Sequence, residues 1–501
     1  MDREVGIRFS EILIPDEKYK KKWAVIACDQ FTSNPEYWAK TSRAVGGAPS
    51  ALHIILPEIY LREADVEDRV SFAKQTMERY IADGVLVKLP AGTVLVERET
   101  PYGTRIGLML AVDLEQYDTD AAKKPLIRAT EQTVQSRVPP RMRIREGAML
   151  ECPHIMLLIN DPKDTVIAPV YQARNNCALV YDNNLIQDGG HVKGWYVDDQ
   201  KLLGGIVDAL AALKAKAADG MLFAVGDGNH SLASAKAVWE EKKRGMAEEE
   251  REESPLRYAL CEVVNLYDHG ISMHPIHRML FNVEPSAALR DLVSILNSMG
   301  ADARMMYTRG SRSIAREGMQ IIQFESKMAK GRIEICRPVD ELVSKTLTTA
   351  LDRLVEQMPR AELDYIHGDD EFHDLAKEHS NIGFYMEPML KEQLFSSVIE
   401  YGVLPKKAFS LGLAVEKRYY YECRLLVNLK VAAEPEEGET EAAETEMPEV
   451  SAQPTAAPAA QEYAVPEEYV PQDAQMPDEY ADDEEEAPRK KRGLFGRRKD
   501  R

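Results

Sequence analysis

The stretch MLFAVGDGNHSLASAKAVWEEKK, residues 221–243, carries three local signals in a row. Its apolar start, residues 221–225, is typical of a buried strand. Residues 226–231 contain two glycines and small polar side chains, which favour a tight turn. Residues 232–243 then place apolar side chains on one helical face and gather charge at the far end. The sequence therefore predicts a strand, a turn and a helix in direct succession.

The turn lies at a predicted helix N-terminus, where unpaired backbone N–H groups and the helix dipole favour an anion such as phosphate. Its glycines let the backbone approach a ligand closely. Asp227 is a candidate ligand for a divalent metal, and His230 is a candidate for contacting phosphate or moving a proton. The structural alternative is that Asn229 or Ser231 caps the helix. The candidate ligand contacts are Gly226, Asp227, Gly228, Asn229, His230 and Ser231.

A second candidate segment, PLIRATEQTVQSRVPPRMRIREG, spans residues 125–147 and sets arginines beside a glutamate. Arg128 is a candidate phosphate clamp with Thr130 near it, and Glu131 is a candidate base for a hydroxyl nucleophile. The alternative interpretation is a solvated, charged start of a helix. Further cations follow at residues 404–407 (LPKK) and near Arg418, for a phosphate or for the surface.

Two other segments carry polar groups that invite a functional interpretation. The segment YDHGISMHPIHRMLF has three histidines, but Pro275 interrupts any regular helix and no carboxylate lies at a familiar ligand spacing. We therefore prefer a loop from which Arg278 reaches an anion over a metal site. In ACDQFT, residues 27–32, Asp29 follows an apolar run, where it either contacts a ligand or caps the next turn.

Composition limits the classes of protein to consider. The chain has 501 residues, 44% of them hydrophobic, which suits two or three globular domains. A net charge of −20 argues against broad binding to nucleic acid, although a phosphate can still bind locally. The 6 cysteines form no CxxC pair, which favours a reducing compartment. With no signal-peptide core and no apolar run of membrane-spanning length, we expect a cytoplasmic protein without a membrane span.

Three regions are predicted along the chain. Residues 1–282 form a core with an N-terminal elaboration, for which the family resemblance given below implies nucleotide binding, and residues 283–431 form an α+β domain. Residues 432–501 are rich in Glu, Pro and Ala, so we expect a disordered tail. That tail carries 20 acidic and 8 basic side chains, a net of −12, and ends in the basic cluster RKKRGLFGRRKDR. The tip either docks on an acidic protein partner or an anionic surface, or only adds solubility.

Strand and helix patterns alternate through the first two regions, which predicts an α/β (α+β) fold with a mixed sheet and flanking helices. Helices are expected at residues 63–84, 202–220, 286–300, 339–357 and 390–402. Strands are expected at residues 85–99 and 105–114, joined by a hairpin, and in CPHIMLLIND, RYALCEVVNLY, MQIIQFES, GRIEICR and RYYYECRLLVNLKV.

Taken together, Gly-Asp-Gly-Asn-His-Ser, IRATEQT, ACDQFT, LHIILPE, PIHRMLF and the LPKK region resemble the DUF1015 family, which is named for a domain of unknown function. The resemblance covers residues 12–432. That family is similar to the ParB/sulfiredoxin-like superfamily, whose members bind nucleotides with a loop at a helix start. One member of the superfamily is a free-serine kinase that uses a nucleoside diphosphate, with a loop resembling Asp-Gly-His-His-Arg.

The resemblance implies residue roles in this chain. Asp227, Gly228 and His230 match the loop, whereas Asn229 stands where many relatives have His. Ser231 stands where the relatives' Arg would grip phosphate bidentately. Another cation must then replace that arginine, and Arg128 and Arg278 are the candidates. Glu131 is the candidate for the kinase-like general base.

The sequence thus supports two hypotheses. The first is a phosphotransferase that binds ADP or ATP with Mg²⁺ on the turn and phosphorylates a small hydroxylated metabolite, with free serine as the guess that the family suggests. The second is a non-catalytic regulatory protein that senses a nucleotide or phosphometabolite and recruits a partner through its tail. A ligand-induced rise in melting temperature without phosphate transfer would separate them.

Overall fold

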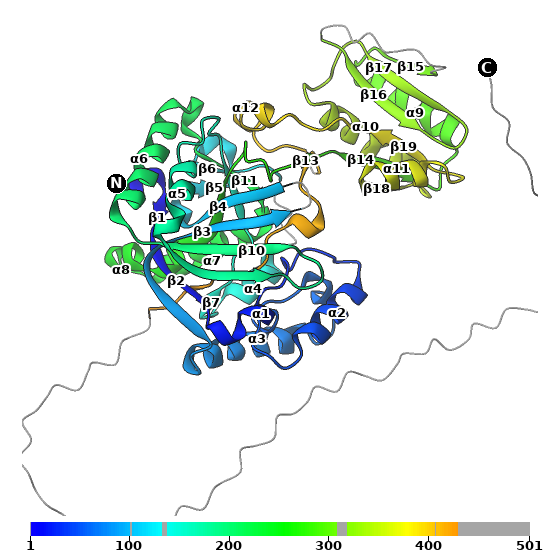
Figure 1. Ribbon diagram of the computed structural model, residues 1–501. Coiled ribbons are helices and arrows are strands. Elements are labelled where there is room, and N and C mark those ends of the chain that lie inside the picture. The colour runs from blue at the N-terminus through cyan, green and yellow to red at the C-terminus, as the bar shows by residue number, and fades with distance from the viewer. Residues whose placement is uncertain (1, 101–102, 133–137, 308–317, 406, 429–501) are drawn as a thin grey trace, which may run out of the picture. The chain divides into compact units, whose positions relative to one another are not determined.

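The computed structural model describes residues 2–100, 103–132, 138–307, 318–405 and 407–428, and Met1–Val431 form one compact unit. Its largest element is an eleven-stranded mixed sheet (Figure 1). The main path of this sheet runs in the order β5 (Tyr117–Asp118), β6 (Ile127–Ala129), β11 (Phe223–Asp227), β8 (Met156–Ile159), β12 (Tyr258–Asn265), β4 (Gly103–Asp113), β3 (Leu86–Thr100), β10 (His191–Val197) and β9 (Ala178–Asn184). Two N-terminal strands extend it, because β1 (Ile7–Arg8) pairs with β4 and β2 (Ser10–Pro15) pairs with β3.

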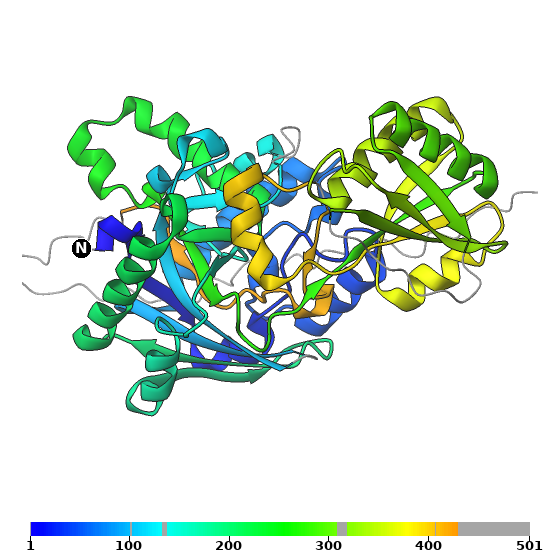
Figure 2. The ribbon, with the colours of Figure 1, turned by 90° about the horizontal axis from the view of Figure 1, so that it is seen from above.

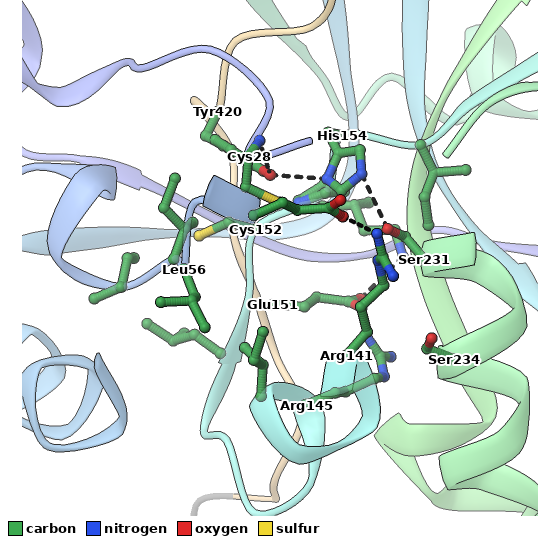
Figure 3. A pocket seen from close by; sticks show the side chains of 18 of the residues that line it. Cys28, Leu56, Arg141, Arg145, Glu151, Cys152, His154, Ser231, Ser234 and Tyr420 are labelled. Carbon is green, nitrogen blue, oxygen red and sulfur yellow. Dashed lines mark hydrogen bonds and ion pairs between the residues drawn. The ribbon is translucent and has the colours of Figure 1, made fainter. Parts of the chain in front are cut away.

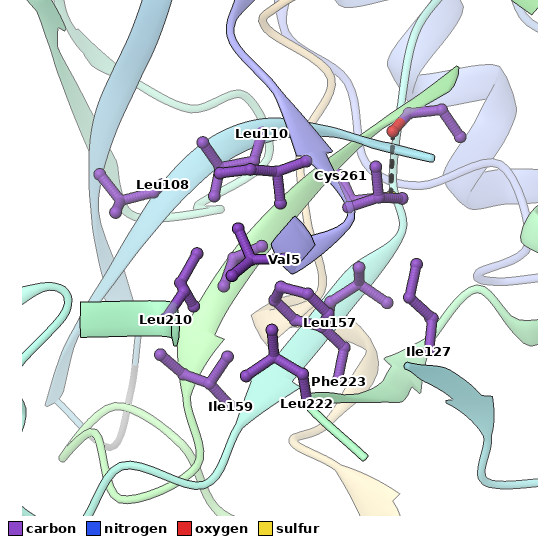
Figure 4. Close-up of a cluster of buried hydrophobic side chains, with 14 of the residues drawn as sticks. Val5, Leu108, Leu110, Ile127, Leu157, Ile159, Leu210, Leu222, Phe223 and Cys261 are labelled. Carbon is purple, nitrogen blue, oxygen red and sulfur yellow. Dashed lines mark hydrogen bonds between the residues drawn. The ribbon is translucent and has the colours of Figure 1, made fainter. Parts of the chain in front are cut away.

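Helices cover both faces of this sheet, as the alternation of side chains along β8 requires. Leu157 and Ile159 point to one apolar cluster (Figure 4), and Leu158 between them points to another on the opposite face. Apolar side chains of α6 and α7 join the first cluster. The helices before the six-stranded sheet are α1 (Lys20–Trp23), α2 (Pro35–Val45), α3 (Val66–Ala82), α4 (Val138–Arg145), α5 (Ala168–Ala173), α6 (Gln200–Lys216), α7 (Asn229–Lys242) and α8 (Glu248–Glu253).

A second sheet of six strands has the order β15 (Ala303–Tyr307), β17 (Lys330–Ile335), β16 (Gln320–Glu325), β19 (Ile382–Tyr385), β14 (Ile276–Phe281) and β18 (Glu362–His367). All of its pairings are antiparallel. Apolar side chains of two helices pack on it around Leu292 and Leu351. Its helices are α9 (Pro285–Ser298), α10 (Val343–Gln357) and α11 (Asp369–Ala376).

The chain then returns to the large sheet. Leu394 and Phe395 of α12 (Lys391–Tyr401) pack with Leu158 of β8, and this helix is coloured orange in Figure 2. The segment after α12 pairs with two short strands at different places instead of with one long strand. These are β13 (Met273–His274) paired with β20 (Ser410–Leu411), and β7 (Leu150–Glu151) paired with β21 (Arg424–Leu425).

The strand predicted over residues 418–431 was wrong in its extent, because only Arg424–Leu425 is a strand among the described residues of that range. The backbone there divides its hydrogen bonds among different neighbours. Tyr420 N–H donates to Val25 O at 2.9 Å, and Cys423 N–H donates to Leu13 O at 2.8 Å. No single partner strand runs alongside, so a continuous ladder cannot form.

A buried charge cluster fixes this returning segment. Glu262 of β12 is fully buried and lies 3.2 Å from Arg105 Nε of β4 and 2.7 Å from Arg418 Nη1. Gly107 makes room for it, because a Cβ there would lie 2.6 Å from Glu262 Oε1. Arg418 also pairs with Glu422 and donates to Pro153 O at 2.9 Å. If the segment moved, the buried charges of Glu262 and Arg418 would lose their partners, which is strongly destabilising. The cluster therefore holds the segment in one place.

The predicted fold class is confirmed, since a large mixed sheet carries flanking helices. None of the helices in the described ranges combines the length and apolar character that crossing a bilayer requires. The tail of residues 432–501 lies outside the described residues, as do Thr133 and Arg137. The predicted boundary between residues 282 and 283 stays a prediction.

We expect Glu262→Ala to lower the free energy of unfolding by about 3–5 kcal/mol, because Arg105 and Arg418 would stay buried without their carboxylate. Chemical denaturation followed by circular dichroism measures the change. Glu36→Ala is the control: its pair with Lys40 is solvent-exposed, so stability should barely change. If the two variants lost the same free energy of unfolding, the buried cluster would not stabilise the fold more than an exposed ion pair does.

Candidate functional site

Three strand ends meet at one edge of the large sheet, and their pairing dictates which residues gather there. β11 runs parallel to β6, with Val225 opposite Ala129, so the residues that follow both strands are neighbours. β11 runs antiparallel to β8, with Asp227 opposite Met156, so the residues that precede β8 join them. Segments at residues 130–132, 226–231 and 153–155 are thereby brought together.

The turn after β11 needs its glycines for two different reasons. A Cβ on Gly226 would overlap the side chain of Leu411 and lie 2.9 Å from Leu158 Cγ. Gly228 has a φ of 79°, in the left-handed region that other residues rarely adopt. Gly228 is also the N-cap of α7 and contributes no side-chain cap. The turn therefore leads the backbone straight from the strand into the first turn of the helix.

This first turn faces a cavity of about 1150 Å³. The predicted residues 226–231 all line the cavity, together with Thr130 and Glu131. Two lysines from the returning segment, Lys407 and Lys417, supply cations to the same wall. The cavity thus combines a helix N-terminus and ammonium groups, which favour an anionic ligand, with the carboxylates of Asp227 and Glu131.

Asp227 is held close to a lysine but keeps one oxygen without a hydrogen bond. Its Oδ2 atom lies 3.4 Å from Lys417 Nζ, and both side chains are largely buried. No hydrogen bond to this oxygen exists among the described residues. This oxygen faces the Lys417 ammonium without a hydrogen bond, so its capacity to accept hydrogen bonds is not fully used.

Glu131 is the second carboxylate of the cavity. Burial raises the pKa of Glu131 above its usual value, Lys407 opposes this shift, and the Asp227 carboxylate adds to it. Glu131 also forms an isolated β-bridge with Leu404, which places the returning segment beside it. A carboxylate whose pKa is raised toward neutrality is suited to accept a proton in a reaction.

Two residues predicted to contact a cofactor mainly hold the turn together. Thr130 N–H donates to Asn229 Oδ1 at 3.2 Å, and Thr130 Oγ1 donates to Val225 O at 2.6 Å. Both side chains are buried at the cavity wall. They tie the end of β6 to the start of α7, so they position the residues that face the ligand.

The two arginines predicted to replace the relatives' phosphate-binding Arg lie elsewhere in the described structure. Arg128 Nη2 is 3.0 Å from Asp219 Oδ2, at the opposite end of β11 from the turn. Arg278 is buried in the six-stranded sheet, where Nη2 donates to Thr348 Oγ1 at 3.4 Å and the guanidinium lies over Tyr365. Neither lines the cavity. The cations that line the cavity include Lys407 and Lys417 of the returning segment, whose LPKK and Arg418 regions the sequence analysis also named as sources of cations.

The metal hypothesis for the three histidines also fails in the described part of the chain, where no group of three or more His, Cys, Asp or Glu side chains could hold an ion. Both ring nitrogens of His277 already have partners within the protein. Nδ1 accepts from Met386 N–H at 3.1 Å, and Nε2 lies 3.1 Å from Asp369 Oδ1.

Sequence reasoning missed a hydrogen-bonded chain next to the turn. In Figure 3, His154 points toward Ser231 on one side and Tyr420 on the other. Its Nε2 lies 3.0 Å from Ser231 Oγ, and its Nδ1 lies 2.8 Å from Tyr420 Oη. The signal available was the position of His154 immediately before a buried strand, but its partner Tyr420 is far away in sequence.

Asp29, which follows an apolar run in the sequence, lies beside this chain and lines the cavity. Its Oδ2 atom is 3.7 Å from His154 Nε2. Burial opposes ionisation, but the His154 charge and the Gln30 amide outweigh it, so the pKa of Asp29 is lowered. The cavity therefore has an ionised carboxylate on this side as well.

Comparison with known proteins identifies the family. The family model described as "protein of unknown function (DUF1015)" matches residues 8–354, and the chain belongs to this family. The segment that supplies Lys407 and Lys417 lies beyond that match. No curated protein matches the chain.

Among solved structures, a conserved hypothetical protein from Pyrococcus furiosus is 12% identical, with 62% of this chain and 90% of that chain covered and a TM-score of 0.32. Free serine kinase in complex with AMP is 12% identical, with 62% and 90% covered and a TM-score of 0.35. A variant of free serine kinase in complex with ADP is 13% identical, with 62% and 91% covered and a TM-score of 0.35. Membership of the ParB/sulfiredoxin-like superfamily stays a prediction.

The raised pKa of Glu131 predicts a pH dependence of folding. The unfolded chain releases this proton near pH 4.3, about the usual glutamate value, whereas the folded protein releases it at higher pH. Between those two pKa values the folded state binds more proton, so the carboxyl makes stability fall as pH rises. Relative to the wild type, Glu131→Gln should therefore gain stability across this window in denaturation curves.

Glu36→Gln is the control of opposite sign. A hydrogen bond from Lys40 lowers the pKa of Glu36, so its contribution to stability grows as pH rises toward the unfolded value. Relative to the wild type, Glu36→Gln should lose only a little stability over that lower window, because its pair with Lys40 is solvent-exposed. If the difference in unfolding free energy from the wild type changed with pH in the same direction for both variants, Glu131 would not titrate as described.

Proposed function

We propose that this DUF1015 protein is a nucleotide-dependent phosphotransferase that acts on a small hydroxylated metabolite. The observation that carries the proposal is the Asp227 carboxylate, buried beside the first turn of α7 with one oxygen that no described residue hydrogen-bonds. It lies in a large cavity together with Lys417 and Glu131. Phosphoryl transfer needs mainly positioning and neutralisation of charge, and these groups supply both.

The phosphates of ADP or ATP bind at the start of α7 in this proposal. The N–H groups of the first helical turn have no carbonyl one turn earlier to accept from them, and the helix dipole adds positive potential there. Lys407 and Lys417 neutralise the remaining charge from the opposite segment. His230 lines the cavity in the same turn and contacts the transferred phosphoryl group.

The residues present fit a Mg²⁺ ion that arrives with the nucleotide. Mg²⁺ prefers oxygen ligands and is usually held by one or two carboxylates plus substrate phosphates. Asp227, which lines the cavity, would hold it through its carboxylate. The ion, when bound, supplies neutralisation of the charge that develops on the phosphate oxygens.

Glu131 acts as the base in this proposal. Its half-buried side chain lines the cavity close enough to Asp227 for that carboxylate to act on it, and its raised pKa gives it more affinity for the proton of an acceptor hydroxyl. Free serine is one acceptor of this class.

One observation favours the alternative of a non-catalytic regulatory protein that binds a nucleotide or phosphometabolite. Two polar side chains of the turn already form hydrogen bonds within the protein, because Asn229 contacts Thr130 and Ser231 contacts His154. Fewer groups are then left to grip a transferring phosphoryl group. A melting temperature that rises with nucleotide and Mg²⁺, without transfer to any acceptor, would support this alternative.

The first test is phosphate transfer from labelled ADP or ATP to a panel of hydroxylated metabolites, with Mg²⁺ present. Asp227→Asn removes the charge that holds the ion, and Glu131→Gln removes the base, so each should lower kcat/KM by about 10²–10⁴-fold. Asp219→Asn is the matched control, since Asp219 pairs with Arg128 outside the cavity. Full turnover by Asp227→Asn would refute the assignment.

A second test measures nucleotide binding directly. Lys417→Met removes a buried ammonium from the cavity, and the loss of a hydrogen bond to a charged group corresponds to about 10–150-fold weaker binding. Isothermal calorimetry with ADP and with ATP gives the Kd values. Lys193→Met on β10, outside the cavity, should bind as the wild type does.

A further inference from the structure

Next to the large cavity lies a small chamber of about 130 Å³ (Figure 3). The two spaces are adjacent, because four residues line both of them: Glu58, Leu61, Arg141 and Ser231. The proposed function leaves this chamber unused. Its composition also differs from that of the cavity, and this difference indicates what it binds.

The wall of the chamber is mainly apolar, and its charged members are already paired. Arg141 pairs with Glu58, and Arg145 pairs with Glu151. The guanidinium groups of the chamber are thus neutralised by carboxylates that line it too, in contrast to the cavity with its lysines. The apolar wall consists of Ile54, Ile55, Leu56, Leu61, Met77, Ile144, Leu150, Ile155 and Leu260.

The size of the chamber sets the size of its ligand. In another protein, an engineered apolar cavity of about 150 Å³ stays dry and binds benzene. A chamber of about 130 Å³ with apolar walls is similar, so it suits an apolar group of about five or six carbon atoms. Water gains few hydrogen bonds on such a surface and is readily displaced.

The polar rim of the chamber lies where the phosphoryl group would be transferred. Ser231 is in the first turn of α7, and its hydroxyl is held 3.0 Å from His154 Nε2. Tyr420 holds the other ring nitrogen, so the imidazole is fixed in orientation. A hydroxyl group at this rim can exchange hydrogen bonds with Ser231 while the rest of its molecule lies in the chamber.

We propose that the chamber binds the apolar part of the acceptor, so that the substrate class is an alcohol with an aliphatic or aromatic group of up to about six carbons. This inference rests on the proposed function and narrows its acceptor. Free serine would leave the chamber empty, because it has no apolar group to place there. The hydroxyl of the acceptor lies at the rim beside Ser231, toward the phosphate end of the cavity.

The test uses the full chain and a homologous series of 1-alkanols from methanol to octanol, with binding measured by NMR titration. Each added carbon that enters the chamber should tighten binding about fourfold, and the increase should stop near six carbons. Protection of Cys152, which lines the chamber, from alkylation should follow the same series, with Cys336 as the internal reference. Affinity that does not depend on chain length would overturn the proposal.

Variants of half-buried Ile144, which lines the chamber, sharpen the test. Ile144→Ala enlarges the space, so the increase in affinity should continue to longer alkanols. Ile144→Trp fills it, so the dependence on chain length should disappear. Ile321→Trp, at a half-buried position on β16, is the matched control and should leave the series unchanged. If both Ile144 variants showed the same dependence of alkanol affinity on chain length as the wild type, the alkanols would bind elsewhere and the assignment would be refuted.

The outcome separates this inference from the proposed function. If alkanols bind as described but neither ADP nor ATP binds, the chamber stands as a binding site and phosphotransfer is refuted. If nucleotide binds and a polar acceptor such as serine is phosphorylated while alkanols do not bind, the phosphotransferase stands and the chamber proposal is refuted.

Discussion

A carboxylate buried between two guanidinium groups connects the last described segment of the chain to the centre of the large sheet. Glu262 contacts Arg105 and Arg418, and the desolvation of these charges makes any other position of the segment costly. Lys417 precedes Arg418 directly, so the same contact sets the ammonium group 3.4 Å from the Asp227 carboxylate. The candidate site therefore depends on a charge cluster that itself lies outside the cavity.

The geometry of strand pairing explains why the candidate catalytic and binding residues lie at one edge of the large sheet. The parallel pairing of β11 with β6 and its antiparallel pairing with β8 bring three segments to one edge of the sheet. Several backbone groups there are bound within the protein, such as Thr130 N–H by Asn229 and Val225 O by Thr130, whereas the first N–H groups of α7 have no carbonyl one turn earlier. Two adjacent spaces result, one charged and one apolar, and Ser231 lies on the boundary between them.

Local reasoning predicted the strand, turn and helix around residues 221–243 well. Leu232, Ala235 and Trp239 of α7 pack in the same core cluster, as their helical spacing requires. The same reasoning misplaced Arg128, because a sequence cannot show that Asp219 accepts its guanidinium at the far end of β11. It also missed His154, whose partner Tyr420 is distant along the chain.

By itself, the sequence determined the strand, turn and helix around residues 221–243, since hydrophobic periodicity and the glycine at φ 79° act through neighbours a few residues apart. It also determined that a carboxylate, an imidazole and a hydroxyl follow the strand. Only the tertiary structure decided which cations join them, because Lys407 and Lys417 reach the cavity through contacts across long stretches of chain. Such contacts depend on burial and on ion pairing between distant segments, which no local pattern encodes.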